Sequence, residues 1–395
     1  MPKLDPIALA RAQLELDRKI DRTAKGLFAI KRARMGASAF AFLRGSAPVF
    51  YRLLRELPEL GRGPDGRAWL TGDLHVQNFG AYRTDDASSG QTRVVFGPND
   101  FDESCVGPVR LDVLRLSVSW LLALDERGLP ASRRIDSCRA LLEGWALGAF
   151  GRRVRMRQPA PVTRLVARVA GRTKESMHRA YTRGSGSKLT LQRDARLWPI
   201  SRTIAARVKR AFDAYAARTC TRHDVDLDHF EVLDIARRVA GTGSLGAERF
   251  AILARGGAHG EWLFDLKEEA PRSASGLPAA GLTGAARVVR AIETCAPAPP
   301  RMLGTTQLGT LSMLVRRLSP QEDKLDPTES DFAELDELAH YIGWLAGRMH
   351  RGSAIGSLGR TWPAAELRAM LERAIMLAGI HESAHLAYVA GFQGR

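Results

Sequence analysis

Apolar residues recur at three- and four-residue steps through most of the first 150 residues, which is the period of an amphipathic helix. A break near Gly45 and Pro48 divides one of these stretches. Residues 68–70 and 92–96 are short apolar runs of strand length, and residues 88–90 mark the turn before the second run. The pattern predicts helices over residues 5–34, 38–57, 110–125 and 132–150.

The second half of the chain has a different pattern, in which short apolar runs replace the helical period. Three runs between residues 231 and 267 predict three strands, and residues 311–318 predict a fourth. Helices are expected over residues 283–295, 331–351, from 363 onward, and in most of the basic segment 160–218.

These elements predict an α+β protein with a mainly helical large lobe and a small antiparallel sheet. The changes of pattern place boundaries near residues 225 and 325. Residues 1–225 then form the large lobe, residues 226–325 form the β-rich lobe, and residues 326–395 supply helices that return to the large lobe.

The chain has 395 residues and a formal net charge of +16, which favours anionic partners such as nucleotides or phosphorylated substrates. A general arginine bias is the alternative explanation. The basic residues are densest between residues 152 and 222, where aromatic residues are few, so stacking on single-stranded bases has little support. We therefore expect a nucleotide partner, with nucleic acid as a less favoured one.

No uninterrupted apolar run reaches the roughly 18 residues that span a bilayer. The first residues are charged and lack the apolar core of a signal peptide. The four cysteines lie far apart and form no CxxC pair, which argues against a zinc site or a disulfide framework. We expect a soluble cytoplasmic protein without a membrane partner.

Two short segments near the start of the chain concentrate acidic and amide side chains. GDLHVQNF places Asp73 and Asn78 five positions apart, and NDFDE adds Asp100 and Asp102. A carboxylate can orient or deprotonate a hydroxyl group, and amide and carboxylate oxygens suit magnesium. Each residue taken singly is explained as well by a turn or a helix cap. Because both segments follow predicted strands, we interpret them together as a metal and phosphate site.

A glycine-rich motif lies between the first two predicted strands of the second half. Gly241, Gly243 and Gly246 form GxGxxG, with Ser244 inside it. In a dinucleotide-binding unit this motif would open a helix, but here a strand follows. A glycine-rich hairpin between strands is typical of kinases, in which it covers the phosphates of ATP. A plain hairpin is the alternative.

The third predicted strand carries Lys267 on an otherwise apolar run, and a buried lysine needs an anion. Nucleotide phosphates would serve, with a helix glutamate as the orienting partner, and Glu293 is our candidate. Lys267 as a surface charge is the alternative. Arg44 either pairs with an acidic residue or phosphate at the site or covers a helix surface. We interpret His75 as a polar contact within its loop.

The segments GDLHVQNFG, FGPNDFDESCVGPVRLDVLRLSVS and AFLRGS resemble the bacterial family called domain of unknown function 2252. The loops are also similar to the HGDLHxxN and IDFxD motifs of aminoglycoside phosphotransferases and choline kinases. This resemblance implies a protein-kinase-like fold, with Asp73 as catalytic base, Asn78 and Asp100 on magnesium, and Asp112 supporting the catalytic loop. Thr71 departs from the pattern, because these kinases have histidine there.

Asp102 also departs from it, standing where protein kinases have glycine. The motif order differs too, since kinases place the glycine-rich loop and the lysine first. A circular permutation would reconcile the order, because permutation is tolerated where chain ends lie close together.

We therefore expect an ATP- and magnesium-dependent phosphotransferase acting on an unidentified small molecule. The glycine-rich loop and Lys267 would position the triphosphate. Three alternatives stay open: transfer of AMP on the same fold, a non-catalytic nucleotide-binding protein of the pseudokinase type, and a basic nucleic-acid-binding protein.

Overall fold

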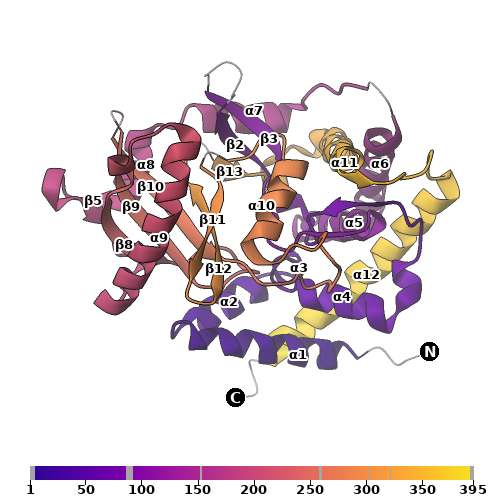
Figure 1. Ribbon diagram of the computed structural model, residues 1–395. Coiled ribbons are helices and arrows are strands. Elements are labelled where there is room, and N and C mark those ends of the chain that lie inside the picture. The colour runs from indigo at the N-terminus through magenta and orange to yellow at the C-terminus, as the bar shows by residue number, and fades with distance from the viewer. Residues whose placement is uncertain are drawn as a thin grey trace.

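The structure is a computed structural model that describes residues 5–85, 92–151, 154–257, 260–300, 302–320 and 322–391. The chain is a mixture of helices and antiparallel strands, as the sequence pattern predicted. The predicted turn at residues 88–90 lies outside the described residues. In Figure 1 a large sheet lies at one side of the molecule and a group of long helices at the other.

The largest sheet has six antiparallel strands and contains the four strands predicted from the second half. Its order is β11 (Gly304–Leu308), β12 (Leu311–Arg317), β10 (Gly260–Glu268), β9 (Arg249–Gly257), β8 (Val232–Arg238) and β7 (Leu197–Trp198). Lys267 of β10 lies between Arg249 of β9 and Leu314 of β12. Since successive side chains alternate between faces, Leu263, Asp265 and Lys267 share one face of the sheet.

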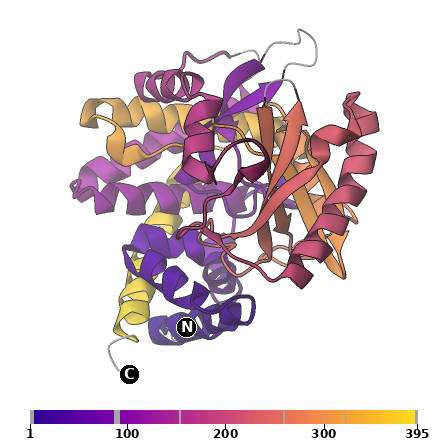
Figure 2. The ribbon, with the colours of Figure 1, turned by 90° about the vertical axis from the view of Figure 1, so that its left-hand side faces the viewer.

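The opposite face of this sheet is apolar and covered by the helix α9 (Arg202–His223). Phe212 and Tyr215 of α9 pack edge-on against Phe264 of β10, with Phe250 in the same buried cluster. Figure 2, which turns the molecule by 90°, shows α9 lying along the outside of the strands. Because α9 covers one face of the sheet, the other face, which carries Lys267, is the one that faces the acidic loops.

The helical side of the molecule is built on α5 (Arg110–Glu126), α6 (Ala131–Phe150), α11 (Leu335–Gly352) and α12 (Ala364–Ala390). α5 is buried from Asp112 to Leu124, which fits the apolar residues that occur on every side of it. α6 and α11 pack closely through glycines. A Cβ at Gly144 would lie 2.0 Å from the carbonyl oxygen of His340, and one at Gly347 would lie 2.2 Å from that of Trp145.

The N-terminal segment was predicted as one helix over residues 5–34, and this is wrong in its middle. The structure has α1 (Pro6–Arg18), a short 3-10 turn, and α2 (Leu27–Gly36). Gly26 adopts a left-handed conformation with φ of 91°, and the Asp21 side chain accepts a hydrogen bond from the Phe28 amide. The break turns α2 away from α1. The predicted break near Gly45 is confirmed, between α3 (Ala39–Gly45) and α4 (Ala47–Glu56).

Two small sheets connect the large sheet to the helices. One has the order β14 (Ala354–Ile355), β1 (Arg67–Leu70) and β4 (Cys105–Pro108), and the other β13 (Glu322–Lys324), β2 (Phe79–Asp85) and β3 (Thr92–Pro98). The remaining elements are α7 (Ala160–Ala170), α8 (Lys174–Tyr181), β5 (Thr182–Arg183), β6 (Thr190–Leu191) and α10 (Gly284–Cys295). The first acidic loop joins β1 to β2, and the second acidic loop follows β3.

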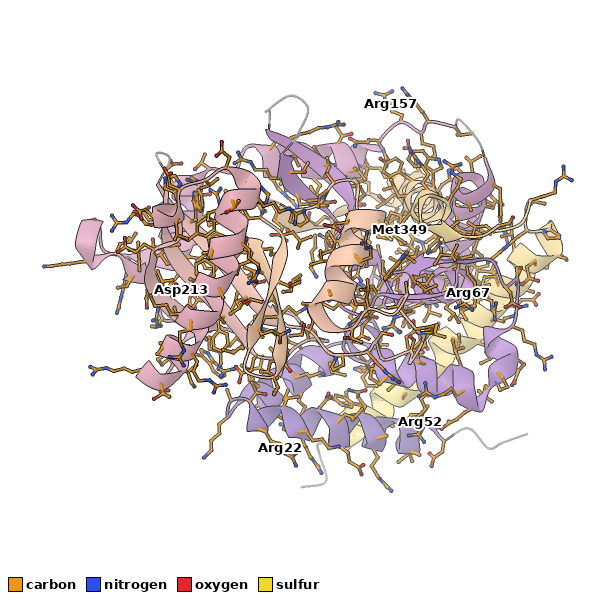
Figure 3. All side chains as sticks on the ribbon, in the orientation of Figure 1. Arg22, Arg52, Arg67, Arg157, Asp213 and Met349 are labelled. Atoms are coloured by element: carbon orange, nitrogen blue, oxygen red, sulfur yellow. The ribbon has the colours of Figure 1, made fainter. Side chains whose placement is uncertain are left out.

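The first and last helices lie side by side. α1 packs along α12, and the hydroxyl of Tyr388 donates to the buried carboxylate of Asp17 over 3.1 Å. Arginine side chains such as Arg22, Arg52 and Arg157 project from the surface (Figure 3). Within the described residues, no helix has the length and apolar character needed to cross a membrane.

Candidate functional site

The loop after β1 is fixed by a buried carboxylate. Asp112, in the first turn of α5, accepts hydrogen bonds from the backbone amides of Thr71 (2.8 Å) and Gly72 (3.0 Å). Gly72 has a φ of 76°, and a Cβ there would lie 1.9 Å from the carbonyl oxygen of Glu103. Only glycine fits this close crossing of the two acidic loops.

Asp112 also meets a histidine from the far end of the chain. Trp145 donates from Nε1 to Nδ1 of His350 over 3.0 Å, so the proton of His350 lies on Nε2, which is 3.3 Å from Asp112 Oδ2. Thr71 also lies against this carboxylate, with its hydroxyl at 3.3 Å. Thus His350 supplies an imidazole at the support of the loop, next to Thr71.

Asp73 lies at the start of the loop and is paired with Arg115. The guanidinium of Arg115 is fully buried, binds the Asp73 carboxylate, and also donates to the Leu43 carbonyl over 2.8 Å. Burial raises the pKa of Asp73 to about 7; Arg115 opposes this shift, while Glu103 and Asp100 add to it. A carboxyl with this pKa takes up and releases protons near neutral pH.

Asn78 presents a free oxygen beside Asp73. Its Nδ2 donates to the Asp73 carbonyl over 2.8 Å, which fixes the amide, while its buried Oδ1 has no hydrogen-bond partner among the described residues. The backbone amide of Asn99 donates to the backbone carbonyl of Asn78 over 2.9 Å. This hydrogen bond joins the first acidic loop to the loop that carries Asp100. A buried amide oxygen without a partner is an available metal ligand.

The second acidic loop reaches the large sheet through Lys267. The ammonium of Lys267 forms an ion pair with Asp102 and lies 3.3 Å from Glu269. Burial would lower the pKa of Lys267, but the two carboxylates raise it. Burial would raise the pKa of Asp102, but Lys267 lowers it. The lysine is therefore a buried cation held by the early half of the chain.

Glu293 does not contact Lys267. It faces outward from α10, and its nearest basic partner is Arg222 of α9, at 3.8 Å. α10 instead turns the buried Arg287 toward the acidic loop, where the guanidinium donates to the carbonyls of Ser104 (2.6 Å) and Asp102 (2.7 Å). The helix thus supports the loop backbone, and the carboxylate beside Lys267 comes from Glu269.

The glycine-rich loop lies between β8 and β9 and is held by the N-terminal helices through its carbonyl groups. Thr23 donates to the Gly246 carbonyl (2.6 Å), Lys31 donates to that of Gly243 (3.4 Å), and Arg34 donates to that of Gly241. Gly241 and Ser244 line the main cavity, so this loop closes one end of it.

The main cavity has a volume of about 550 Å³ and lies between the large sheet and the acidic loops. Lys267, Asp100, Asp102 and Gly241 are all in its wall, which brings together residues separated by more than 130 positions. Asp73 lies beyond this wall, within electrostatic reach of Asp100. A cavity of this size accommodates a ligand as large as a nucleotide.

The residues fit a magnesium ion that is bound together with phosphate. No group of three or more His, Cys, Asp or Glu side chains in the described ranges is arranged to hold a metal alone. Magnesium keeps several waters and uses only one or two carboxylates besides phosphate oxygens. The unpartnered Oδ1 of Asn78 and the carboxylate of Asp100 are the oxygen ligands that these two loops would offer, and of the two residues Asp100 lines the cavity.

Arg44 faces the same acidic groups without pairing with them. Its guanidinium lies 5.5 Å from the ring centre of Phe40, and in the described part of the chain it has neither an ion pair nor a hydrogen bond. Burial lowers its pKa, whereas Asp73 and Asp100 raise it. His75 is buried in an edge contact with Phe40, and its Nδ1 has no hydrogen-bond partner among the described residues.

Several site residues carried no local signal in the sequence. Arg115 and Arg287 lie in ordinary helical patterns, and His350 ends a helix. Glu269 lies only two positions after Lys267, and this spacing does not suggest a partner from a following helix. The one available signal was an arginine or histidine on an otherwise buried helix face, which requires a charged partner.

Comparison with known proteins gives one family. Residues 22–389 match a family described as "Uncharacterized protein conserved in bacteria (DUF2252)". No curated protein and no solved structure gives a significant match to the chain.

Proposed function

We propose that this chain, which belongs to the bacterial family DUF2252, is a magnesium-dependent phosphotransferase that moves the terminal phosphoryl group of ATP to a small hydroxyl acceptor. The observation that carries the proposal is the ion pair of Lys267 with Asp102, two residues from Asp100, in the wall of one cavity. A phosphate chain in this cavity would meet the lysine on one side and the acidic loops on the other.

The order of elements around the cavity supports a kinase-like fold with permuted connectivity. The glycine-rich loop joins β8 to β9, the next strand, β10, carries the buried Lys267, and the helix α10 follows. The small lobe of kinases has the same order of elements. The loop with Asp73 and Asn78 would follow this lobe in a kinase, but here it precedes it. The side-by-side packing of α1 and α12 is consistent with such an exchange of chain ends.

The chain's own residues supply positioning and proton transfer. Asp73 accepts the proton of the acceptor hydroxyl; the acceptor oxygen forms a bond to the terminal phosphorus, the bond from that phosphorus to the bridging oxygen breaks, and ADP leaves. Arg115 and Asp112 keep the loop in place. Lys267 neutralises the phosphates, and Arg44 is free to bind the transferred group. Bound magnesium, held by Asn78 and Asp100, supplies charge neutralisation on the phosphates.

The proposal is tested by binding and turnover in single variants. Magnesium and ATP together should raise the melting temperature of the wild type more than ATP alone, because only the folded site binds the complex. Asp100→Asn should lose the magnesium-dependent increment. Asp73→Asn should keep that increment but lower ATP hydrolysis, with water as acceptor, about a hundredfold.

Asp213→Asn is the matched control, since Asp213 is an exposed residue of α9 that pairs with Lys209 and is not in the cavity wall. It should change neither property. A wild type that responds to no nucleotide, with or without magnesium, would refute the proposal.

A further inference from the structure

We propose that this cavity holds its donor by the phosphate chain and not by a nucleobase, so that inorganic tripolyphosphate binds as well as a nucleoside triphosphate. The inference rests on the proposed function and specifies its donor. It comes from the charged groups on the sheet face next to Lys267.

A caged aspartate lies two residues before Lys267 on the same face of β10. Asp265 is 2 % exposed and accepts from Arg249 Nε at 2.9 Å. Arg238 Nη1 lies 2.7 Å away, and Arg316 Nε lies 3.8 Å away. Three guanidinium groups surround one carboxylate, and all four side chains line the cavity. The sheet wall beside Lys267 therefore carries an excess of positive charge.

Some of the apolar side chains on the same sheet face are packed against other parts of the protein. Met177 of α8, with Leu191 and Leu197 from the following segment, packs into a buried cluster with Ala251 and Leu263 of the sheet. Nearer the cage, the side chains change from apolar to charged within one step along β10. Leu263, Leu314 and Leu318 nevertheless line the cavity. The inference therefore rests on the charged groups beside Lys267.

The charge of the whole cavity favours a polyanion. Nine lysine and arginine side chains line it, against six aspartates and glutamates. Arg316 also pairs with Glu322 at 2.7 Å, so its cage position is fixed. A guanidinium has five N–H donors, and those not used by Asp265 can bind phosphate oxygens. Phosphates beyond the one at Lys267 would then lie on the arginine cage.

The same transfer is balanced with an inorganic donor. The acceptor oxygen bonds to the terminal phosphorus of tripolyphosphate, the bridging P–O bond breaks, pyrophosphate leaves, and Asp73 takes the acceptor proton. Nothing in this step requires a base or a ribose.

The test compares donors by calorimetry on the full chain with magnesium. ATP, GTP and tripolyphosphate should bind with dissociation constants within about threefold of one another, and adenosine should not bind. ATP binding about tenfold or more tighter than both GTP and tripolyphosphate would overturn the inference and leave the proposed function standing. Failure of every triphosphate to bind would overturn both.

A variant locates the effect. Arg316→Gln should weaken ATP and tripolyphosphate alike, by about tenfold, because a charge-assisted contact is lost. Arg255→Gln is the matched control: Arg255 lies on β9 but is exposed, pairs with Glu231 and is not in the cavity wall. Weaker ATP binding in Arg316→Gln with unchanged tripolyphosphate binding would contradict the inference. The donor comparison on the wild type stands even if the variant does not fold.

Discussion

Arg115 shows how a single side chain can connect stability and function. It is a fully buried cation whose carboxylate partner, Asp73, is the proposed proton acceptor. A charge taken out of water is costly, and its partner offsets that cost only while both are present. The pair therefore keeps Asp73 in place in the loop and limits the rise of its pKa.

Replacing Arg115 by methionine should lower the free energy of unfolding by about 3 to 5 kcal/mol, because a buried carboxylate is left unpaired. Urea denaturation measures this. The double variant with Asp73→Asn should recover part of the loss, since it removes the unpaired charge. Arg139→Met, which breaks an exposed pair with Asp136, should cost less than about 1 kcal/mol. Equal losses for the two single variants would contradict the buried-pair account.

At the scale of elements, hydrophobic periodicity predicted the helices and strands that bury a continuous apolar face of their own. α5, α6 and the strands β8, β9 and β10 were found where the pattern placed them, because each buries a continuous apolar face. The two-residue strands β5, β6, β7 and β14 were missed, since pairing partners and not their own residues determine them. The partner assigned to Lys267 failed for a related reason: a helix pattern does not tell which way a glutamate such as Glu293 faces.

The packing of α6 on α11 depends on glycine at the crossing. Gly144→Ala should destabilise the protein by about 3 kcal/mol, because its Cβ would lie 2.0 Å from a backbone oxygen and the helices must separate. Gly379→Ala, in the interior of α12 with open space around it, should instead stabilise by roughly 0.5 kcal/mol. Thermal unfolding compares the two. Destabilisation of similar size in both variants would refute the role of close helix packing.

At the scale of the whole molecule, the site joins two halves of the chain. Sequence reasoning proposed Asp73, Asn78 and Asp100 from two acidic motifs that follow predicted strands, and Lys267 from its place on an apolar strand, because these residue types suit phosphoryl transfer. Sequence reasoning did not indicate the arginine cage around Asp265, which forms only when the four strands β8, β9, β10 and β12 are paired. The cage is the reason for extending the proposed donor from ATP to an inorganic chain of phosphates.

The most direct test of the central claim is a crystal structure of the chain with magnesium and a non-hydrolysable triphosphate. The account predicts that the phosphates lie between Lys267 and the loop of Asp100, with the metal on Asn78 and Asp100. A triphosphate bound outside this cavity, or bound in it with Lys267 still paired to Asp102 and no metal at Asn78, would contradict the account.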